Sequence, residues 1–161
     1  MDRLWTPWRF DYIRSVDKET TCVFCRIATE SRDEENLVLF RGSHSFIVMN
    51  LYPYTSGHLL IVTHRHISFL NDAKPEELSE IIHLGQHCEA ALRKEFHPHG
   101  YNMGFNLGRS AGAGVEHHLH MHVLPRWTGD SNFVSVVGET RVLPEELPNT
   151  YRRLLPHFRK L

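Results

Sequence analysis

The sequence has almost no charge bias, because 18 lysines and arginines face 19 acidic residues and the formal net charge is -1. Such a balance offers no basic surface to nucleic acid or to an acidic membrane. No apolar run is long enough to cross a bilayer, and the opening segment MDRLWTPWRF carries charges and a proline where a signal peptide needs an apolar stretch. With only three cysteines and no secretion signal, we expect a cytoplasmic protein that binds neither membrane nor nucleic acid.

The chain also lacks low-complexity tracts and repeats of about 20 to 50 residues. Its 161 residues and an apolar content of 41% suit one domain with a buried core. We expect a single domain over residues 1–161, with an N-terminal arm at 1–20, a core at 22–127 and a C-terminal tail at 144–161. The basic stretch YRRLLPHFRK in the tail is interpreted as cations near a helix C-terminus.

Hydrophobic periodicity predicts an α+β fold. Pro75 is suited to a first helical position, and apolar residues recur at helical spacing from there to residue 96. Short apolar segments indicate strands, which are ENLVLFRGSHSFIVMN (two strands around a turn at Gly42–Ser43), HLLIVTH, YNMGFNLG and HHLHMHVLP, the last ended by Pro125. The tail is expected to be partly helical, with interruptions at Pro148 and Pro156. This order indicates an antiparallel sheet of about five strands with one long helix and a C-terminal helical tail.

Histidine is the residue in surplus, with 13 copies, four of them in HHLHMHVLPRW at residues 117–127. Alternate residues of a strand share a face, so His118, His120 and His122 point one way and the apolar residues between them point to the core. A solvated face would more often carry Lys, Glu or Thr, and buried imidazoles need partners. The face therefore indicates either a metal site or nucleophilic catalysis by one imidazole that its neighbours orient.

The preceding segment, NLGRSAGAG at residues 106–114, combines small residues with a serine. Such a loop can expose backbone N–H groups to phosphate oxygens, although taken alone it also looks like a flexible turn. Next to a strand of histidines it favours chemistry at phosphorus.

The stretch HHLHMHVLP resembles the motif of the histidine triad (HIT) superfamily, in which three histidines alternate with apolar residues. SFIVMNLYPYTSGHLLIVTHRH resembles the nucleoside-binding strand pair of that family, and GYNMGFNLG resembles its Asn-bearing strand, so the match runs from Cys22 to Trp127. The segments LWTPWRFDYI and PRWTGDSNF are similar to the bacterial diadenosine tetraphosphate phosphorylase-like branch.

The resemblance implies a nucleotidyl hydrolase or transferase that acts on the α-phosphate of dinucleoside polyphosphates of the diadenosine tetraphosphate type. His120 would attack the α-phosphorus and form a covalent nucleotidyl-histidine, and neutral imidazole is already a nucleophile at pH 7. His122 would hydrogen-bond a phosphate or leaving-group oxygen, and His118 completes the catalytic set. Asn50 would face the ribose hydroxyls, although a turn-forming asparagine explains this position equally well. Phosphate oxygens would be held by Asn106, Ser110 and the loop backbone, including Gly112 and Gly114.

The stretch AGVEH departs from one branch of the family. The phosphoramidase branch usually carries Gln and Ser just before the triad, and neither is present, which weakens the alternative of a nucleoside phosphoramidate hydrolase. It stays open whether Glu116, His117 or His122 assists the leaving group, and whether water or phosphate is the acceptor. The alternative from another class is a non-catalytic nucleotide-binding sensor, against which the intact triad weighs.

Cys22 and Cys25 form a C-x-x-C motif, which indicates a metal site if two further ligands are present. His64 or His66, and His117 or His118, are candidates; a redox pair or two small core residues are the alternatives. The resemblance implies Cys22, Cys25, His66 and His118, because a metal-binding subset of the family uses this set for a structural zinc. Cys88 lies on the apolar face of the predicted helix and is expected in the core.

A homodimer is also expected. Proteins of the triad family typically pair so that their sheets run together, with the long helices at the interface. The sequence gives independent support, because a small sheet has exposed edges that are usually covered or paired. The apolar arc of residues 75–96 is wide enough to pack on the sheet and still contact a partner. The N-terminal arm and the C-terminal tail are the other expected contributors.

Overall fold

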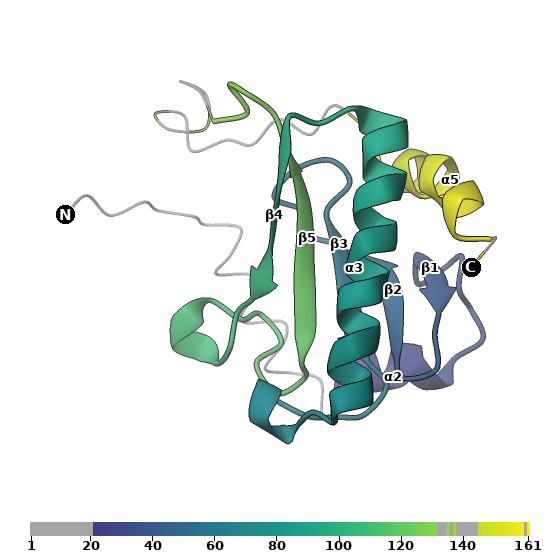
Figure 1. Ribbon diagram of the computed structural model, residues 1–161, viewed down its shortest axis with the longest axis vertical. Helices are drawn as coiled ribbons and strands as arrows, with labels where there is room; N and C mark the ends of the chain where they lie inside the picture. Colours follow the sequence, from purple (N-terminus) through teal and green to yellow (C-terminus); the bar gives the residue numbers. More distant parts are fainter. Residues whose placement is uncertain (1–20, 132–134, 136, 138–144, 160) are drawn as a thin grey trace.

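Five strands form one antiparallel sheet in the order β1-β2-β3-β5-β4. The structure is a computed structural model that describes residues 21–131, 135, 137, 145–159 and 161. The strands are β1 at Val38–Arg41, β2 at Ser45–Met49, β3 at Leu59–Thr63, β4 at Gly100–Phe105 and β5 at His120–Arg126 (Figure 1). The predicted α+β fold with an antiparallel sheet of about five strands is confirmed.

The central strands β2 and β3 are buried along their whole length. Their sequences, SFIVM and LLIVT, are almost continuous apolar runs, as a strand covered on both faces requires. Alternate side chains enter two different cores. Ile47 and Ile61 belong to the core beneath the long helix, whereas Phe46 and Val62 belong to a second core on the opposite face.

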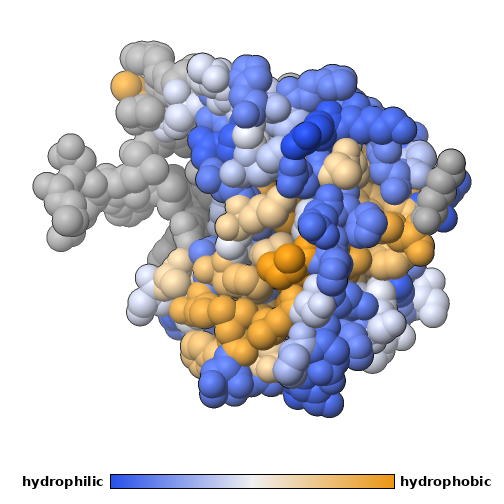
Figure 2. All heavy atoms as spheres, in the orientation of Figure 1, coloured by the Kyte–Doolittle hydropathy of each residue, from blue (hydrophilic) through white to orange (hydrophobic). Residues whose placement is uncertain are grey.

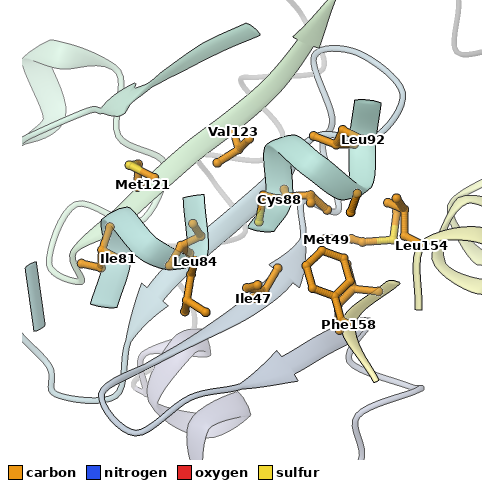
Figure 3. Close-up of a cluster of buried hydrophobic side chains, with 14 of the residues drawn as sticks. Ile47, Met49, Ile81, Leu84, Cys88, Leu92, Met121, Val123, Leu154 and Phe158 are labelled. Atoms are coloured by element: carbon orange, nitrogen blue, oxygen red, sulfur yellow. The ribbon is translucent and has the colours of Figure 1, made fainter. Parts of the chain in front are cut away.

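The long helix α3 occupies Pro75–Phe96, as predicted, and covers one face of the sheet (Figure 1). Its buried residues include Ile81, Cys88 and Leu92, which lie with Met121 and Val123 of β5 in the core that Figure 3 shows. The expected core position of Cys88 is therefore confirmed. The helix ends at His97, which takes the left-handed conformation with φ of 47°.

A buried ion pair ties the first turn of α3 to the loop that follows β3. Glu77 is 2% exposed and is the only buried carboxylate among the residues that the structure describes. Its two oxygens accept hydrogen bonds from Arg65 at 2.7 Å each, and one of them also accepts the backbone N–H of Lys74 at 2.7 Å. The bonds from Arg65 and then from Lys74 hold the pKa of Glu77 at about 2.

A short helix that was not predicted, α2 at Val23–Thr29, lies against the opposite face of the sheet. Phe24 and Ile27 are its buried residues, and both belong to the second core, with Phe46 and Val62. This packing places Cys22, the residue before the helix, and Cys25, in its first turn, on the sheet face that α3 leaves open.

The C-terminal helix α5 runs without a break from Leu147 to Phe158, so the predicted interruptions at Pro148 and Pro156 are wrong. Pro148 lies in the first turn, where its missing N–H has no helical partner in any case, and Pro156 lies in the last turn. The helix packs on α3 and β1. Its Tyr151 hydroxyl donates to the backbone carbonyl of Val38 in β1 at 3.1 Å.

Strand β5 is displaced from its predicted bounds. It begins at His120 and continues to Arg126, so it is not ended by Pro125. The partner β3 reaches only as far as Val123, and Pro125 is paired on one side alone, with Tyr101 of β4. A proline is tolerated there because no second neighbouring strand needs its N–H.

None of the helices in the described part of the chain is long and apolar enough to cross a membrane. The predicted N-terminal arm at residues 1–20 and the first residue of the predicted tail, 144, lie outside the described residues.

Candidate active site

Three histidines lie on the sheet face opposite α3. His120 and His122 belong to β5, and His118 stands two residues before it. His118, His120 and His122 are 1%, 5% and 8% exposed. The apolar residues between and after them lie in the core beneath α3. Alternation along one strand therefore divides this segment into an apolar side and an imidazole side.

His118 points its two ring nitrogens at different partners. Its Nε2 lies 2.7 Å from the carbonyl oxygen of Thr63, which can only accept, so Nε2 carries the proton. The unprotonated Nδ1 then faces two sulfurs, Cys22 Sγ at 3.4 Å and Cys25 Sγ at 3.6 Å. Burial lowers the pKa of His118 to about 4, which keeps the ring neutral at pH 7.

A fourth donor completes this group, because His66 Nδ1 lies 3.1 Å from Cys25 Sγ. The ligand atoms of Cys22, Cys25, His66 and His118 all lie within 4.8 Å of one another. A tetrahedral zinc with two sulfur and two nitrogen ligands separates its ligand atoms by about 3.3–3.8 Å, so the set fits zinc in chemistry and in spacing. The remaining candidates are placed elsewhere.

The two alternative metal ligands, His64 and His117, contact other groups. His64 Nε2 contacts the carbonyl oxygen of Gly42 at 3.0 Å, and His117 Nε2 contacts Glu116 at 3.2 Å. In the described residues the group that could hold a metal therefore contains His118, the first triad histidine, and His66, the second histidine of the segment THRH. Burial, followed by the neighbouring Cys22, raises the pKa of the Cys25 thiol.

The middle histidine has one ring nitrogen available for chemistry. His120 Nδ1 lies 2.7 Å from the backbone carbonyl oxygen of His118, so Nδ1 carries the proton and Nε2 keeps a lone pair. The Phe24 ring packs 5.2 Å from its centroid, and burial lowers its pKa. The result is a neutral, oriented imidazole, which is what nucleophilic attack requires.

His122 receives its orientation from a residue that was not predicted, His58. His58 Nδ1 accepts the backbone N–H of Tyr54 at 3.1 Å, so its Nε2 carries the proton. That Nε2 lies 2.8 Å from His122 Nδ1 and donates to it, which leaves the proton of His122 on Nε2. Burial lowers the pKa of His122 to about 4. His122 therefore presents a neutral N–H to the site.

His58 stands just before the strand LLIVT and is 1% exposed. In the sequence His58 is only a histidine next to an apolar run, which is a weak sign of a functional residue. Its role comes from the contact with His122 on the neighbouring strand, which the sequence does not reveal. Tyr54 adds to the same group, since its ring stacks over His122 at an interplanar angle of 16°.

Asn50 makes contacts that fit a turn and the site at once. Its Oδ1 accepts the backbone N–H of Tyr52 at 3.0 Å, the turn-forming bond considered above. Its Nδ2 lies 3.2 Å from His58 Nδ1. Asn50 is therefore next to the His58–His122 pair, and its contact with a ribose stays a prediction.

The small-residue loop begins beside the histidines. Asn106 Nδ2 lies 3.5 Å from His122 Nε2, and rotation of the carboxamide would bring its Oδ1 there to accept the Nε2 proton. A short 3-10 helix, η2 at Arg109–Ala111, follows, and it is flanked by Gly108 and Gly112 with φ of 80° and 88°. Ser110 is exposed in η2, and Gly114 is half-buried close behind it. Their contacts with phosphate stay predictions.

Comparisons with known proteins give a consistent result. The family model for the HIT domain matches residues 31–129. The chain is 41% identical to the "AP-4-A phosphorylase" of Mycobacterium tuberculosis over 96% of this chain and 83% of that protein. It is 30% identical to "Protein hit" of Bacillus subtilis over 80% and 88% of the two chains. The crystal structure of a Zn-bound histidine triad family protein from Mycobacterium smegmatis aligns with a TM-score of 0.69 at 28% identity, over 85% of this chain and 92% of that one.

Proposed function

The chain belongs to the HIT domain family, and on that premise we propose that it cleaves a dinucleoside polyphosphate of the diadenosine tetraphosphate type, with inorganic phosphate as the acceptor. The relative with 41% identity bears the name of such a phosphorylase. The observation that carries the proposal is the hydrogen bond from His120 Nδ1 to the His118 carbonyl oxygen, because it leaves Nε2 as an oriented nucleophile in a site of neutral histidines.

The reaction proceeds by two displacements at the α-phosphorus. His120 Nε2 attacks, the bond to the bridging oxygen breaks, and the leaving nucleotide departs as an anion. His120 then carries the nucleotidyl group and a positive charge, which the His118 carbonyl stabilises through the Nδ1 proton. The acceptor attacks the same phosphorus and releases His120 in its neutral form. The N–H of His122 hydrogen-bonds the oxygens whose charge grows in each step.

Turnover of diadenosine tetraphosphate, with and without inorganic phosphate, tests this function. ADP that forms only with phosphate supports a phosphorylase, whereas AMP plus ATP would indicate a hydrolase, and an absence of turnover would favour a nucleotide sensor. His120→Ala should abolish turnover and leave nucleotide binding intact. The matched control is His87→Ala, which removes an exposed histidine from α3. A trapped nucleotidyl adduct that maps to His118 or His122 would refute the assignment of the nucleophile.

We also propose that Cys22, Cys25, His66 and His118 hold a structural zinc. The metal would tie α2 and the loop after β3 to the strand that carries His120, and it would not contact the nucleotide. Metal analysis of untagged protein should find about one zinc per chain, and Cys22→Ser should lose it with a fall in melting temperature. Cys88→Ala removes a thiol from the core and should keep the zinc. A wild-type protein that is stable without metal would contradict the site. Reduced thiols of this kind suit a cytoplasmic location.

We further propose a homodimer that forms through β4 and α3. Strand β4 is an edge of the sheet. Apolar side chains gather on the same side of the molecule (Figure 2), and Ile82 and Met103 are 58% and 41% exposed. Met103 Sδ lies 4.0 Å from the point where a Cβ on Gly85 would stand, so strand and helix form one surface. Sedimentation at micromolar concentration should show two chains, and Met103→Glu should give one. A wild-type protein that sediments as a single chain would overturn this proposal.

A further inference from the structure

A dinucleoside polyphosphate brings several negative charges to a face of histidines that supplies no positive charge. His120 has to be neutral to attack phosphorus. His122 is a neutral ring as well, because its Nδ1 accepts a hydrogen bond from His58 and its only proton is on Nε2. Compensation of the phosphate charge must come from other side chains. Residues 21–73 and 97–131, which carry every site residue, contain no lysine. Arginine is therefore the cation to consider.

Arg109 differs from the other arginines of the region. Seven arginines lie between residues 21 and 131. Arg109 is exposed and forms no ion pair with any residue that the structure describes, and Glu116, the nearest carboxylate along the chain on the C-terminal side, contacts His117 instead. The six that do pair with a carboxylate are Arg26, Arg32, Arg41, Arg65, Arg93 and Arg126.

The loop that carries Arg109 starts at the site. Asn106, three residues earlier, has its Nδ2 3.5 Å from His122 Nε2, and Arg109 is the first residue of η2. The backbone N–H groups of Ala111 and Ala113 donate to the carbonyl of Gly108, and that of Gly112 donates to the carbonyl of Arg109. These three donors serve the turn itself, and the guanidinium of Arg109 is the positively charged group that the loop offers to a bound phosphate.

We infer that Arg109 binds the phosphate group that lies on the side of the α-phosphorus opposite His120. This inference rests on the proposed phosphorolysis. In the first displacement the group is the β-phosphate of the departing ATP, whose bond to the α-phosphorus breaks as the nitrogen–phosphorus bond forms. In-line attack requires the acceptor to enter from the side on which the leaving group left. One anion site therefore serves both steps.

In the second displacement inorganic phosphate occupies this site. It attacks through an unprotonated oxygen, the nitrogen–phosphorus bond breaks, and the bonding pair returns to His120 Nε2. The proton of the phosphate dianion stays on what becomes the β-phosphate of ADP, so no base is needed. Water in the same place would have to lose a proton as it attacks. A guanidinium that holds phosphate there, with its bidentate geometry, selects phosphate over water as acceptor.

The test compares Arg109→Gln and Arg109→Lys with wild type in the conversion of diadenosine tetraphosphate, at varied phosphate concentration. We expect Arg109→Gln to raise the KM for phosphate by roughly 10- to 100-fold, with a smaller change in kcat at saturating phosphate. The share of AMP in the product should rise at low phosphate, and Arg109→Lys should recover part of the phosphate affinity. Arg152→Gln, an exposed arginine of α5, is the matched control and should behave as wild type.

The outcomes separate the inference from the function on which it rests. If wild type forms ADP and Arg109→Gln keeps the wild-type KM for phosphate and the wild-type product ratio, the role of Arg109 is wrong and phosphorolysis stands. If wild type releases only AMP and ATP at every phosphate concentration, both are wrong. An equal rise of the KM for phosphate in Arg109→Gln and Arg152→Gln would show that the effect comes from the net charge of the protein, and it would also overturn the inference.

Discussion

Replacement of Glu77 by Gln should cost more stability than any other removal of a single carboxylate charge in the described part of the chain. The pKa of Glu77 is held at about 2 against an ordinary value of 4.5, and at 1.36 kcal/mol per pH unit this corresponds to about 3 kcal/mol. The side chain of Arg65 is 44% exposed, and solvent screening reduces the figure to about 2–3 kcal/mol. For a chain of this length, that is a fall of about 4–12 °C in melting temperature.

The stability difference between wild type and Glu77→Gln should depend on pH. A carboxylate with a lowered pKa in the folded state contributes in full above its unfolded pKa near 4.5, and the contribution is lost as the pH falls towards 2. The stability gap between wild type and Glu77→Gln should therefore be constant from pH 7 to about 5 and should close between about pH 4.5 and 2. Urea denaturation after metal removal with a chelator measures it without a contribution from zinc release.

Glu89→Gln is the control, because Glu89 forms an ion pair with Arg93 one turn away on the exposed side of α3. The loss of this pair should lower the free energy of unfolding by about 0.5 kcal/mol or less. The reasoning fails if Glu77→Gln is no more destabilising than this control. It also fails if the gap stays the same from pH 6 to pH 3.

Three further changes follow from other contacts. His58→Phe removes the hydrogen-bond donor that holds the proton of His122 on Nε2, and it should lower kcat about 10- to 100-fold with little change in nucleotide affinity. Nitrogen NMR of His122 should show a changed tautomer. An unchanged spectrum would contradict the role of His58. His97→Gly relieves a left-handed residue at the end of α3 and should add about 0.5–1 kcal/mol to the free energy of unfolding, a gain that denaturant titration can confirm or deny. Gly57→Ala places a Cβ 2.9 Å from Leu92 Cδ2 at φ of 77°, and should cost about 1–3 kcal/mol; a neutral result in thermal unfolding would show that the turn before His58 can relax.

The elements of the sheet and the long helix could be predicted because their patterns are local. Strands such as SFIVM and LLIVT and the helical spacing after Pro75 depend on which residues are buried, and one pattern fits each. Helix α2 was missed because it is short, and its helical state depends on the packing of Phe24 against the sheet. Pro156 was misjudged because a proline in the last turn removes one bond without ending the helix.

The histidine face was predictable for the same reason, since alternation assigns His118, His120 and His122 to one side. The role of His58 was not, because it depends on a contact with a residue 64 positions away. The choice of His66 over His64 is of the same kind. Both follow β3, and only the direction of the chain after Thr63 brings His66 to Cys25 while His64 turns to Gly42.

The hydrogen bond from Tyr151 to Val38 bears on how chains can assemble. Val38 lies in β1, the edge of the sheet opposite β4, and its N–H donates to the carbonyl of Asp33 while its carbonyl accepts from Tyr151. An incoming strand would find both groups already satisfied and α5 in its way. Among the residues that the structure describes, β1 is thus a blocked border and β4 a border with a strand on one side only. In the proposed dimer through β4, growth by strand addition would stop after a single two-fold event, because β1 offers no second border, and a closed pair would form where a fibre would otherwise extend.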